Sequence, residues 1–284
     1  MTVRLSAACA LMLTPLFGMA MAMPVRANPP ALWVGDTRQQ VEAKLAQAQQ
    51  PPVGGTLVLL ARQFLGRPYN AFSLDAEPRE QLRLDLTRFD CFLFVEQLLA
   101  MVHSRSADSF AQHVLRLRYS DGQPDYCSRH HYFTIWARNA ERLGLVKDIS
   151  ASLPGASSRE RRLTFMSSHP HSYKPMRQPR ARQCITQLES NLVVRQSFVP
   201  IASLTRAAEK LHSGDIFALV TRVDGLDVTH TGFLERSGKN LNAIHAAPKR
   251  GVMRSQDFVR YAASVDDVVG VSILRPVAAA PAQL

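Results

Sequence analysis

The chain has 284 residues, of which 46% are hydrophobic and 20% are charged, and its formal net charge is +11. This length suits one large domain or two small ones, and it excludes a chain too short to bury a sizeable core. The excess of basic residues raises the rate of encounter with polyanions but identifies none of them.

Residues 1–27 have the pattern of a secretory signal peptide. Arg4 precedes a mostly apolar run, and small residues near its end offer cleavage sites. Pro15 and Gly18 interrupt the run and polar sequence follows it, which argues against a permanent transmembrane anchor. We therefore expect residues 28–284 to form the mature protein in a periplasmic or secreted location. The polyanions there are the cell wall and anionic lipid, so no nucleic-acid partner is expected.

Helical patterns come first along the mature chain. Composition and apolar spacing predict helices over residues 37–50, 56–65, 110–119, 129–143 and 201–211. Residues 82–86 alternate like a short strand. Residues 150–200 are irregular, basic and rich in proline, so we interpret them as a long insertion into a single domain, with at most one helix near 181–192.

The last part of the chain changes to a strand pattern. Strands are predicted over residues 215–220, 228–235, 241–246, 251–253 and 268–274. Helices followed by an antiparallel meander indicate an α+β fold. The sequence contains no internal repeat and no phosphate-binding glycine motif.

The stretch from Asp90 to Val102 is nearly all apolar and predicts a central helix surrounded by protein on most sides. Asp90 is a favourable N-cap, so Cys91 falls on the first turn, where free N–H groups and the helix dipole favour a thiolate over a thiol. This environment makes a cysteine reactive. The alternative interpretation is that Cys91 is only a small buried hydrophobic residue.

Two histidines lie in adjacent predicted strands. Strand alternation places His230 on the same face as Val228 and Gly232, and His245 lies in the next strand. If these strands form a hairpin, the two imidazoles lie side by side. A cysteine at a helix N-terminus, a histidine on a strand and a polar group that orients it are the arrangement of thiol hydrolases. The alternative is a structural role for each histidine.

Three cysteines remain once the signal peptide is removed. An odd number in an oxidising compartment indicates one thiol kept free and one disulfide. We predict that Cys127 pairs with Cys184 and that Cys91 stays free.

The order of several short motifs resembles the NlpC-type papain-like cell-wall peptidases. These motifs are Leu65-Gly66-Arg67-Pro68-Tyr69, Phe89-Asp90-Cys91, Ser213-Gly214-Asp215, Thr229-His230-Thr231-Gly232, and Ile244-His245-Ala246-Ala247 followed by Gly251-Val252. Within that superfamily the chain is most similar to the N-acetylmuramoyl-L-alanine amidase-like family. The narrower match includes Phe94-Val95-Glu96, residues 118–122, residues 128–133 with Trp136, and residues 165–170.

The resemblance implies a papain-like NlpC-type fold, in which the central helix packs on the antiparallel sheet. It implies that Cys91 is the nucleophile, that His230 is the general base and acid, and that His245 orients His230. It also suggests that Tyr69 helps the backbone N–H of Cys91 to bind an oxyanion. The sequence departs from the family pattern at Phe92 and Leu93, where such enzymes carry small hydroxyl residues, so fine specificity is in doubt.

Further residues are candidates for substrate contacts, with a structural role as the alternative for each. They are Asp90, Arg129, His131, Tyr132 and His169. We expect no metal and no cofactor, because the adjacent pair His130-His131 cannot project from a helix as an i, i+4 pair does, and no H-E-x-x-H motif occurs.

The implied reaction is hydrolysis of the amide bond between N-acetylmuramic acid and L-alanine in peptidoglycan or muropeptides, by a protein expected to be a monomer. One alternative is an endopeptidase that cuts between D-glutamate and the diamino acid of the stem peptide. Another is a cell-wall-binding protein without catalytic activity.

Overall fold

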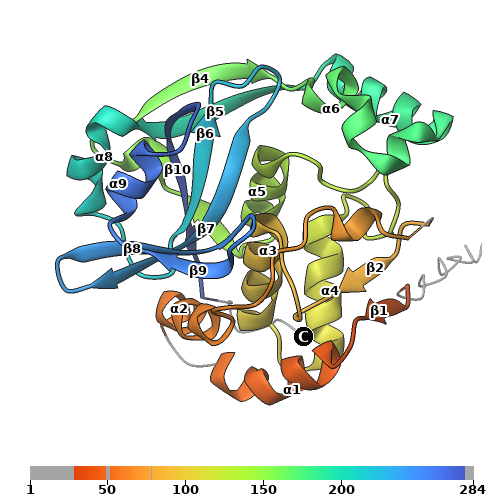
Figure 1. Ribbon diagram of the computed structural model, residues 1–284, viewed down its shortest axis with the longest axis horizontal. Coiled ribbons are helices and arrows are strands. Elements are labelled where there is room, and N and C mark those ends of the chain that lie inside the picture. The colour runs from red at the N-terminus through yellow and green to blue at the C-terminus, as the bar shows by residue number, and fades with distance from the viewer. Residues whose placement is uncertain (1–28, 49–51, 78, 279–284) are drawn as a thin grey trace, which may run out of the picture.

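The computed structural model describes residues 29–48, 52–77 and 79–278 (Figure 1). The predicted signal peptide lies outside the described residues. The helices are α1 (Thr37–Ala48), α2 (Val53–Gln63), α3 (Cys91–Val102), α4 (Ala107–Arg118), α5 (Phe133–Arg142), α6 (Phe165–Ser168), α7 (Pro179–Ser190), α8 (Ile201–Ala208) and α9 (Phe258–Ala263). The strands are β1 (Ala31–Trp33), β2 (Leu82–Leu84), β3 (Val146–Asp148), β4 (Ser157–Arg162), β5 (Val193–Pro200), β6 (Ile216–Thr221), β7 (Val228–Ser237), β8 (Asn240–Ala247), β9 (Gly251–Ser255) and β10 (Val268–Pro276). The predicted mixed α+β composition is therefore confirmed.

Eight strands form one antiparallel sheet in the order β4-β5-β10-β6-β7-β8-β9, with β3 paired to β10. Strands β6 to β9 form the predicted meander. Strand β10 does not extend this meander beyond β9 but lies between β5 and β6. Strands β1 and β2 pair separately and in parallel.

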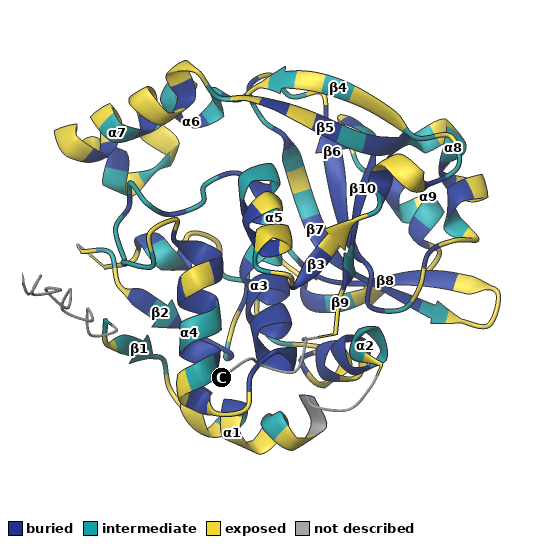
Figure 2. Ribbon diagram, turned by 180° about the vertical axis from the view of Figure 1, so that it is seen from behind, coloured by how far each residue is buried: buried dark blue, intermediate teal, exposed yellow. Residues whose placement is uncertain are grey.

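Helix α3 packs against β7 and β8 and is enclosed on its other sides by α1, α2 and α4. It is buried over nearly its whole length (Figure 2). The ring of Phe94 meets the ring of Phe233 on β7 at 5.6 Å between centroids. Each of its two polar residues has a partner: Glu96 pairs with Arg118 through Oε2, and Gln97 accepts the backbone N–H of Asp85. The expectation of a central helix surrounded by protein is confirmed.

The other face of the sheet is covered by α8 and α9. Strand β6 shows how both faces are buried: Ile216 and Ala218 belong to the core beneath α3, whereas Phe217 and Leu219 belong to the core beneath α8 and α9. Strands covered on both faces and paired on both edges give the central part of the sheet little freedom to move.

The segment 150–200 differs from its prediction. We expected mostly irregular chain, but β4 and β5 extend the sheet at one edge. Arginines on β4 lie across neighbouring backbone instead of pointing into solvent, since Arg159 donates to the Thr221 carbonyl and Arg161 to the Leu226 carbonyl. The predicted helix near 181–192 is confirmed as α7.

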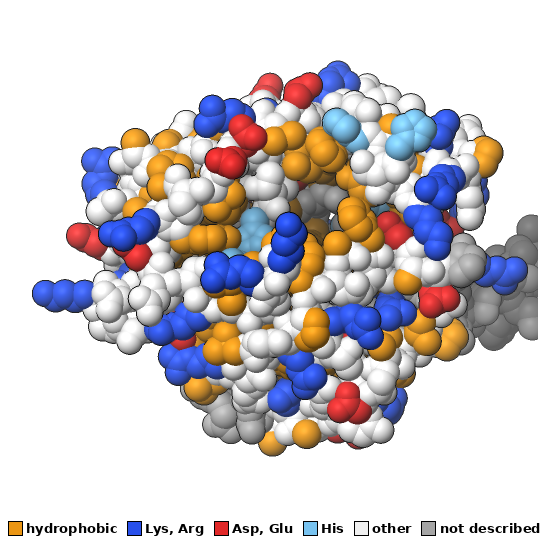
Figure 3. Space-filling model, viewed as in Figure 1, with side chains coloured by type: hydrophobic (Ala, Val, Ile, Leu, Met, Phe, Trp, Pro, Cys, Tyr) orange, Lys and Arg blue, Asp and Glu red, His pale blue; other side chains and the backbone are white. Residues whose placement is uncertain are grey.

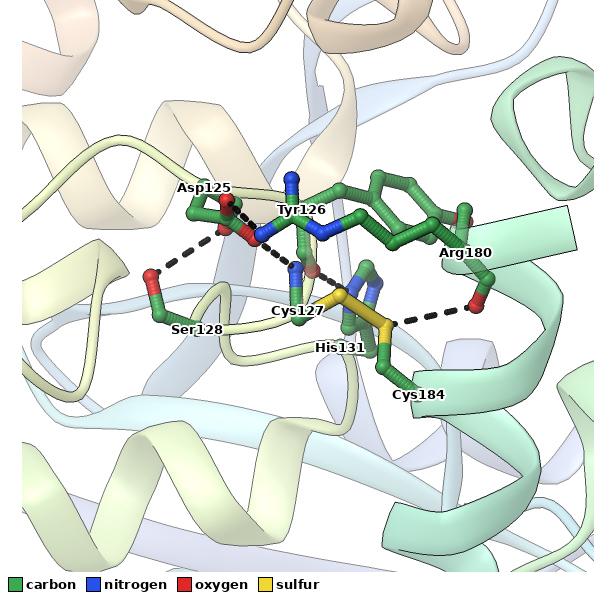
Figure 4. The surroundings of a disulfide bond; sticks show 8 residues. Asp125, Tyr126, Cys127, Ser128, His131, Arg180 and Cys184 are labelled. Carbon is green, nitrogen blue, oxygen red and sulfur yellow. Dashed lines mark hydrogen bonds and ion pairs between the residues drawn. A yellow bond between two sulfur atoms is a disulfide. The ribbon is translucent and has the colours of Figure 1, made fainter. Parts of the chain in front are cut away.

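The part of this segment that contains α6 and α7 has a small core of its own. The predicted disulfide is also confirmed: Cys127 is bonded to Cys184 on α7 (Figure 4). Arg180, also on α7, pairs with Asp125 at 2.7 Å. These links fasten α7 to the loop that precedes α5.

Candidate active site

Cys91 is the first residue of α3. The Asp90 side chain caps the helix by accepting the backbone N–H of Leu93 at 2.7 Å, as its residue type predicts. The preceding Phe89 is hydrogen bonded to the chain at Pro68 and Asn70, at 3.0 and 2.9 Å. This short parallel pairing holds Tyr69 beside the start of α3.

The two imidazoles lie side by side on the sheet, as predicted. Nε2 of His230 on β7 is 2.7 Å from Nδ1 of His245 on β8, and Nε2 of His245 is 2.8 Å from Oγ of Ser255 on β9. A ring nitrogen either donates or accepts, so this chain has two consistent proton orders. When His245 donates to Ser255, His230 donates to His245, and Nδ1 of His230 is left with a free lone pair.

The close packing of the two histidines requires a glycine at position 232. A Cβ atom there would lie 2.6 Å from Cβ of His245 and 2.8 Å from Cε1 of Phe217. On α9, the Tyr261 ring lies 4.7 Å from the His245 ring, between centroids. The imidazole pair is therefore held by protein on several sides.

The thiol lies where β7 has separated from β8. The pairing of β7 with β8 covers Phe233 to Ser237, and the backbone of Thr231, before this stretch, forms a hydrogen bond that lowers the pKa of Cys91. Burial has the larger and opposite effect. With the neighbouring charge of Asp90, it raises the pKa of Cys91 to about 12.

The expectation that the helix N-terminus favours a thiolate was therefore wrong for the free protein, because loss of hydration outweighs the helix N–H groups. Burial likewise lowers the pKa of His230 to about 3, with His245 adding to the effect. The pKa of His245 is lowered to about 4. At neutral pH the free site holds a thiol and two neutral imidazoles.

Two cavities meet at Cys91. The smaller one, of about 150 Å³, is lined by Cys91, by His230 and by the chain from Leu226 to Thr231. The larger one, of about 360 Å³, is lined by Cys91 but not by His230. The face seen in Figure 3 is hollowed near its centre, where hydrophobic side chains predominate.

Four of the six predicted substrate-contact residues line the larger cavity, namely Tyr69, Asp90, Arg129 and His131. The charge of Arg129 is already paired, with Asp75 at 2.6 Å and Glu80 at 3.3 Å. His131 is hydrogen bonded through Nε2 to the carbonyl of Tyr126, and burial lowers its pKa to about 3. Arg129 and His131 therefore shape this cavity without presenting a free charge.

The other two predicted residues lie elsewhere. The Tyr132 hydroxyl donates to Glu189 of α7 and lines neither cavity. His169 is exposed and stacks on Phe165, with 4.2 Å between ring centroids. The contacts of Tyr132 match the structural alternative.

The sequence interpretation missed Ser255, Thr231, Tyr261, Phe72 and Tyr173. Ser255 had a usable signal, because it lies two residues after Met253, the residue paired with His245 in the β8–β9 register. A longer predicted strand would have included it. Thr231 stands inside the quoted motif around His230, but no role was assigned to it. Tyr261 on α9 carries no motif, nor do Phe72 and Tyr173, which line the larger cavity.

Within residues 29–48, 52–77 and 79–278, no three His, Cys, Asp or Glu side chains are grouped closely enough to hold a metal ion. In the same part of the chain, no helix has the length and apolar character needed to cross a bilayer.

The thiol, the paired imidazoles and the α+β sheet define a candidate hydrolase site, and comparison with known proteins gives its family. Residues 59–269 match the model of the AmiA-like family, described as N-acetylmuramoyl-L-alanine amidase-like. The chain belongs to this family. No curated protein matches the chain.

Solved structures share the fold, and one of them is named an amidase. An N-acetylmuramoyl-L-alanine amidase from Bacteroides uniformis ATCC 8492 is 29% identical, with a TM-score of 0.74 over 78% of this chain and 98% of that one. A Bacteroides fragilis protein, provisionally named a xylanase, is 30% identical, with a TM-score of 0.67 over 76% and 98%. A Legionella pneumophila protein shares the fold at 19% identity, with a TM-score of 0.68 over 85% and 93%.

Proposed function

We propose that the protein is a cysteine amidase that hydrolyses the bond between N-acetylmuramic acid and L-alanine in peptidoglycan or muropeptides. The observation that carries this proposal is that Cys91 and His230 line the same cavity. Nε2 of His230 is hydrogen bonded to His245, so its Nδ1 is the nitrogen left for the thiol. The family membership supports the choice of substrate. An NlpC-type papain-like mechanism accounts for the same three residues.

In the proposed reaction, Nδ1 of His230 takes the thiol proton as the Cys91 sulfur attacks the lactyl carbonyl. The backbone N–H of Cys91 and the Tyr69 hydroxyl are the proposed donors to the oxyanion. His230 then gives its proton to the departing amine of L-alanine, which leaves a muramoyl thioester on the sulfur. A water molecule, deprotonated by His230, hydrolyses the thioester and restores the thiol.

The neutral state of the free site fits this order of steps. A buried thiol beside a neutral imidazole needs the proton transfer that a general base provides. His245 and Ser255 serve the reaction by holding the tautomer of His230 whose Nδ1 can accept that proton. Both act on His230 and are positioning residues.

The decisive experiment incubates the mature protein with N-acetylmuramoyl-L-alanyl-D-isoglutamine and weighs the products. We expect free N-acetylmuramic acid and a dipeptide that begins with L-alanine. Cys91→Ala should abolish turnover, whereas Leu59→Ala, on the exposed side of α2, should leave it unchanged.

A longer muropeptide with a diamino acid separates the alternatives. Release of a fragment that begins with the diamino acid, with the muramoyl amide intact, would identify the endopeptidase instead. Binding without turnover, equal in the wild type and in Cys91→Ala, would identify a cell-wall-binding protein.

We also propose that residues 1–27 direct export and that the mature protein acts as a monomer in the periplasm or outside the cell. Cell fractionation with N-terminal sequencing of the mature protein tests the first point. Light scattering of the purified protein tests the second.

A further inference from the structure

If the proposed function holds, the two cavities at Cys91 determine which half of the substrate lies on each side of the sulfur. The amine that leaves must receive a proton from His230, so the stem peptide has to lie on the side where His230 is found. That side is the smaller cavity. The acyl half, which stays on the sulfur, then lies in the larger cavity, which Cys91 lines and His230 does not.

The charges of the larger cavity suit the acyl half. Arg129 is paired with Asp75 and Glu80, and Arg118 is paired with Glu96. His131 and His130 are hydrogen bonded to backbone carbonyls, and burial lowers the pKa of each. Asp90, which also lines the cavity, uses its carboxylate to cap α3 by accepting the backbone N–H of Leu93. Apart from this carboxylate, the cavity presents little free charge. A muramoyl group carries none once its lactyl carboxyl is in amide linkage, whereas the stem peptide has free carboxylates.

Two aromatic side chains lie at this cavity on segments far apart in the chain. Phe72, in the loop before β2, is 59% exposed, and Tyr173 belongs to the segment between α6 and α7. Their rings meet edge to face, with 6.4 Å between centroids and 82° between planes. Phe72 also has a left-handed backbone, with φ of 56°, which is unfavourable for a bulky residue.

Backbone strain of this kind concentrates at ligand-binding sites, and here it occurs at a residue that lines the same cavity as Cys91. Phe72 removes little apolar surface from water in the free protein, so its place beside Tyr173 is not explained by the core. A pyranose ring has an apolar face of C–H groups, and aromatic rings attract such groups through the negative charge of their faces.

We propose that Phe72 and Tyr173 form an aromatic clamp that holds the pyranose ring of the muramoyl group on the acyl side of Cys91. The clamp joins the loop that carries Tyr69 to the segment fastened by the Cys127–Cys184 disulfide. It selects substrates by their sugar and leaves the stem peptide to the smaller cavity.

The first test measures kcat and KM on N-acetylmuramoyl-L-alanyl-D-isoglutamine. Phe72→Ala and Tyr173→Ala should each raise KM about tenfold with little change in kcat, because one stacking contact is worth about 1.4 kcal/mol. Phe72→Trp and Tyr173→Phe should keep most of the affinity. Leu59→Ala is the matched control, because Leu59 is 57% exposed and lines neither cavity. An unchanged KM in both alanine variants would refute the clamp while the amidase proposal stands.

The second test does not need turnover. In the Cys91→Ala background, calorimetry measures binding of the disaccharide N-acetylglucosaminyl-N-acetylmuramic acid and, separately, of L-alanyl-D-isoglutamine. Phe72→Ala should weaken binding of the disaccharide about tenfold and leave binding of the dipeptide unchanged.

If Phe72→Ala instead weakens the dipeptide and not the disaccharide, the direction of the substrate is reversed and the clamp proposal is wrong. If the wild-type protein hydrolyses no muropeptide, the amidase proposal fails. If Phe72→Ala nevertheless weakens binding of the disaccharide, the clamp proposal stands. Equal melting temperatures for Phe72→Ala and Leu59→Ala exclude misfolding as the cause.

Discussion

The imidazole pair and the segment with α6 and α7 are built differently, although both reach Cys91. The histidines lie on strands whose faces are covered by packed helices, and Gly232 lets them approach closely. The segment with α6 and α7 has its own small core and is fastened by a disulfide. The difference suggests a division of work in which the sheet fixes the atoms that react and the segment shapes the wall that selects the substrate.

The largest expected effect concerns the sheet. His245→Ala should lower kcat about a thousandfold with little change in KM, because His230 then loses the partner that fixes its tautomer. His245→Gln, which can still accept a hydrogen bond from His230, should recover part of the loss. Steady-state kinetics on a muropeptide checks both variants. A large rise in KM for His245→Ala would mean that the sheet also selects the substrate, and the division of work would fail.

The second prediction tests the protonation state of the Cys91 thiol, at the start of α3 beside the imidazole pair. Since burial raises the pKa of Cys91 to about 12, the thiolate fraction should still be rising throughout the neutral range. Alkylation by iodoacetamide should become about tenfold faster per pH unit between about pH 7 and about pH 9.

Mass spectrometry of the alkylated protein follows this reaction at Cys91, the one free cysteine among the described residues. Cys91→Ala gives the background rate. A rate that stays flat over this pH range would show a preformed thiolate and imidazolium pair, and would overturn the neutral resting state.

The smallest expected effect concerns the α6 and α7 segment. Replacing both Cys127 and Cys184 by serine should raise KM about tenfold or less, because the segment that carries Tyr173 is then held less firmly in place. It should also lower the free energy of unfolding by about 2–4 kcal/mol. The value of kcat should hardly change, since the imidazole pair lies on the sheet. Kinetics and guanidinium denaturation measure the three quantities, and a fall in kcat without a rise in KM would contradict the division of work.

Secondary structure could be predicted from the sequence where the apolar periodicity and the residues that end an element indicate the same helix or strand. Helix α2 and the strands β6 to β9 follow their apolar patterns, and the apolar run after Asp90 gives the buried helix α3. Strand β4 could not be predicted in this way, because arginines dominate it and are accommodated by carbonyl groups from distant parts of the chain. Such contacts exist only in the folded protein.

For the candidate site, residue type and order were enough to select Cys91, His230 and His245, and the structure confirms that the two imidazoles are hydrogen bonded. The pKa of Cys91 could not be foreseen, because it depends on how much protein surrounds the thiol. Phe72 and Tyr173 could not be selected either, since isolated aromatic residues in loops have no periodicity and their meeting depends on the tertiary structure.

The position of β10 has a consequence for biosynthesis. This strand is the last one along the described chain, yet it lies between β5 and β6, so the earlier strands have no continuous sheet until it is made. Pairings between such distant segments form late and slowly in folding. A chain that stops short of Val268 would therefore keep β4 and β5 separate from the meander β6 to β9, and the two halves of the sheet would not be joined.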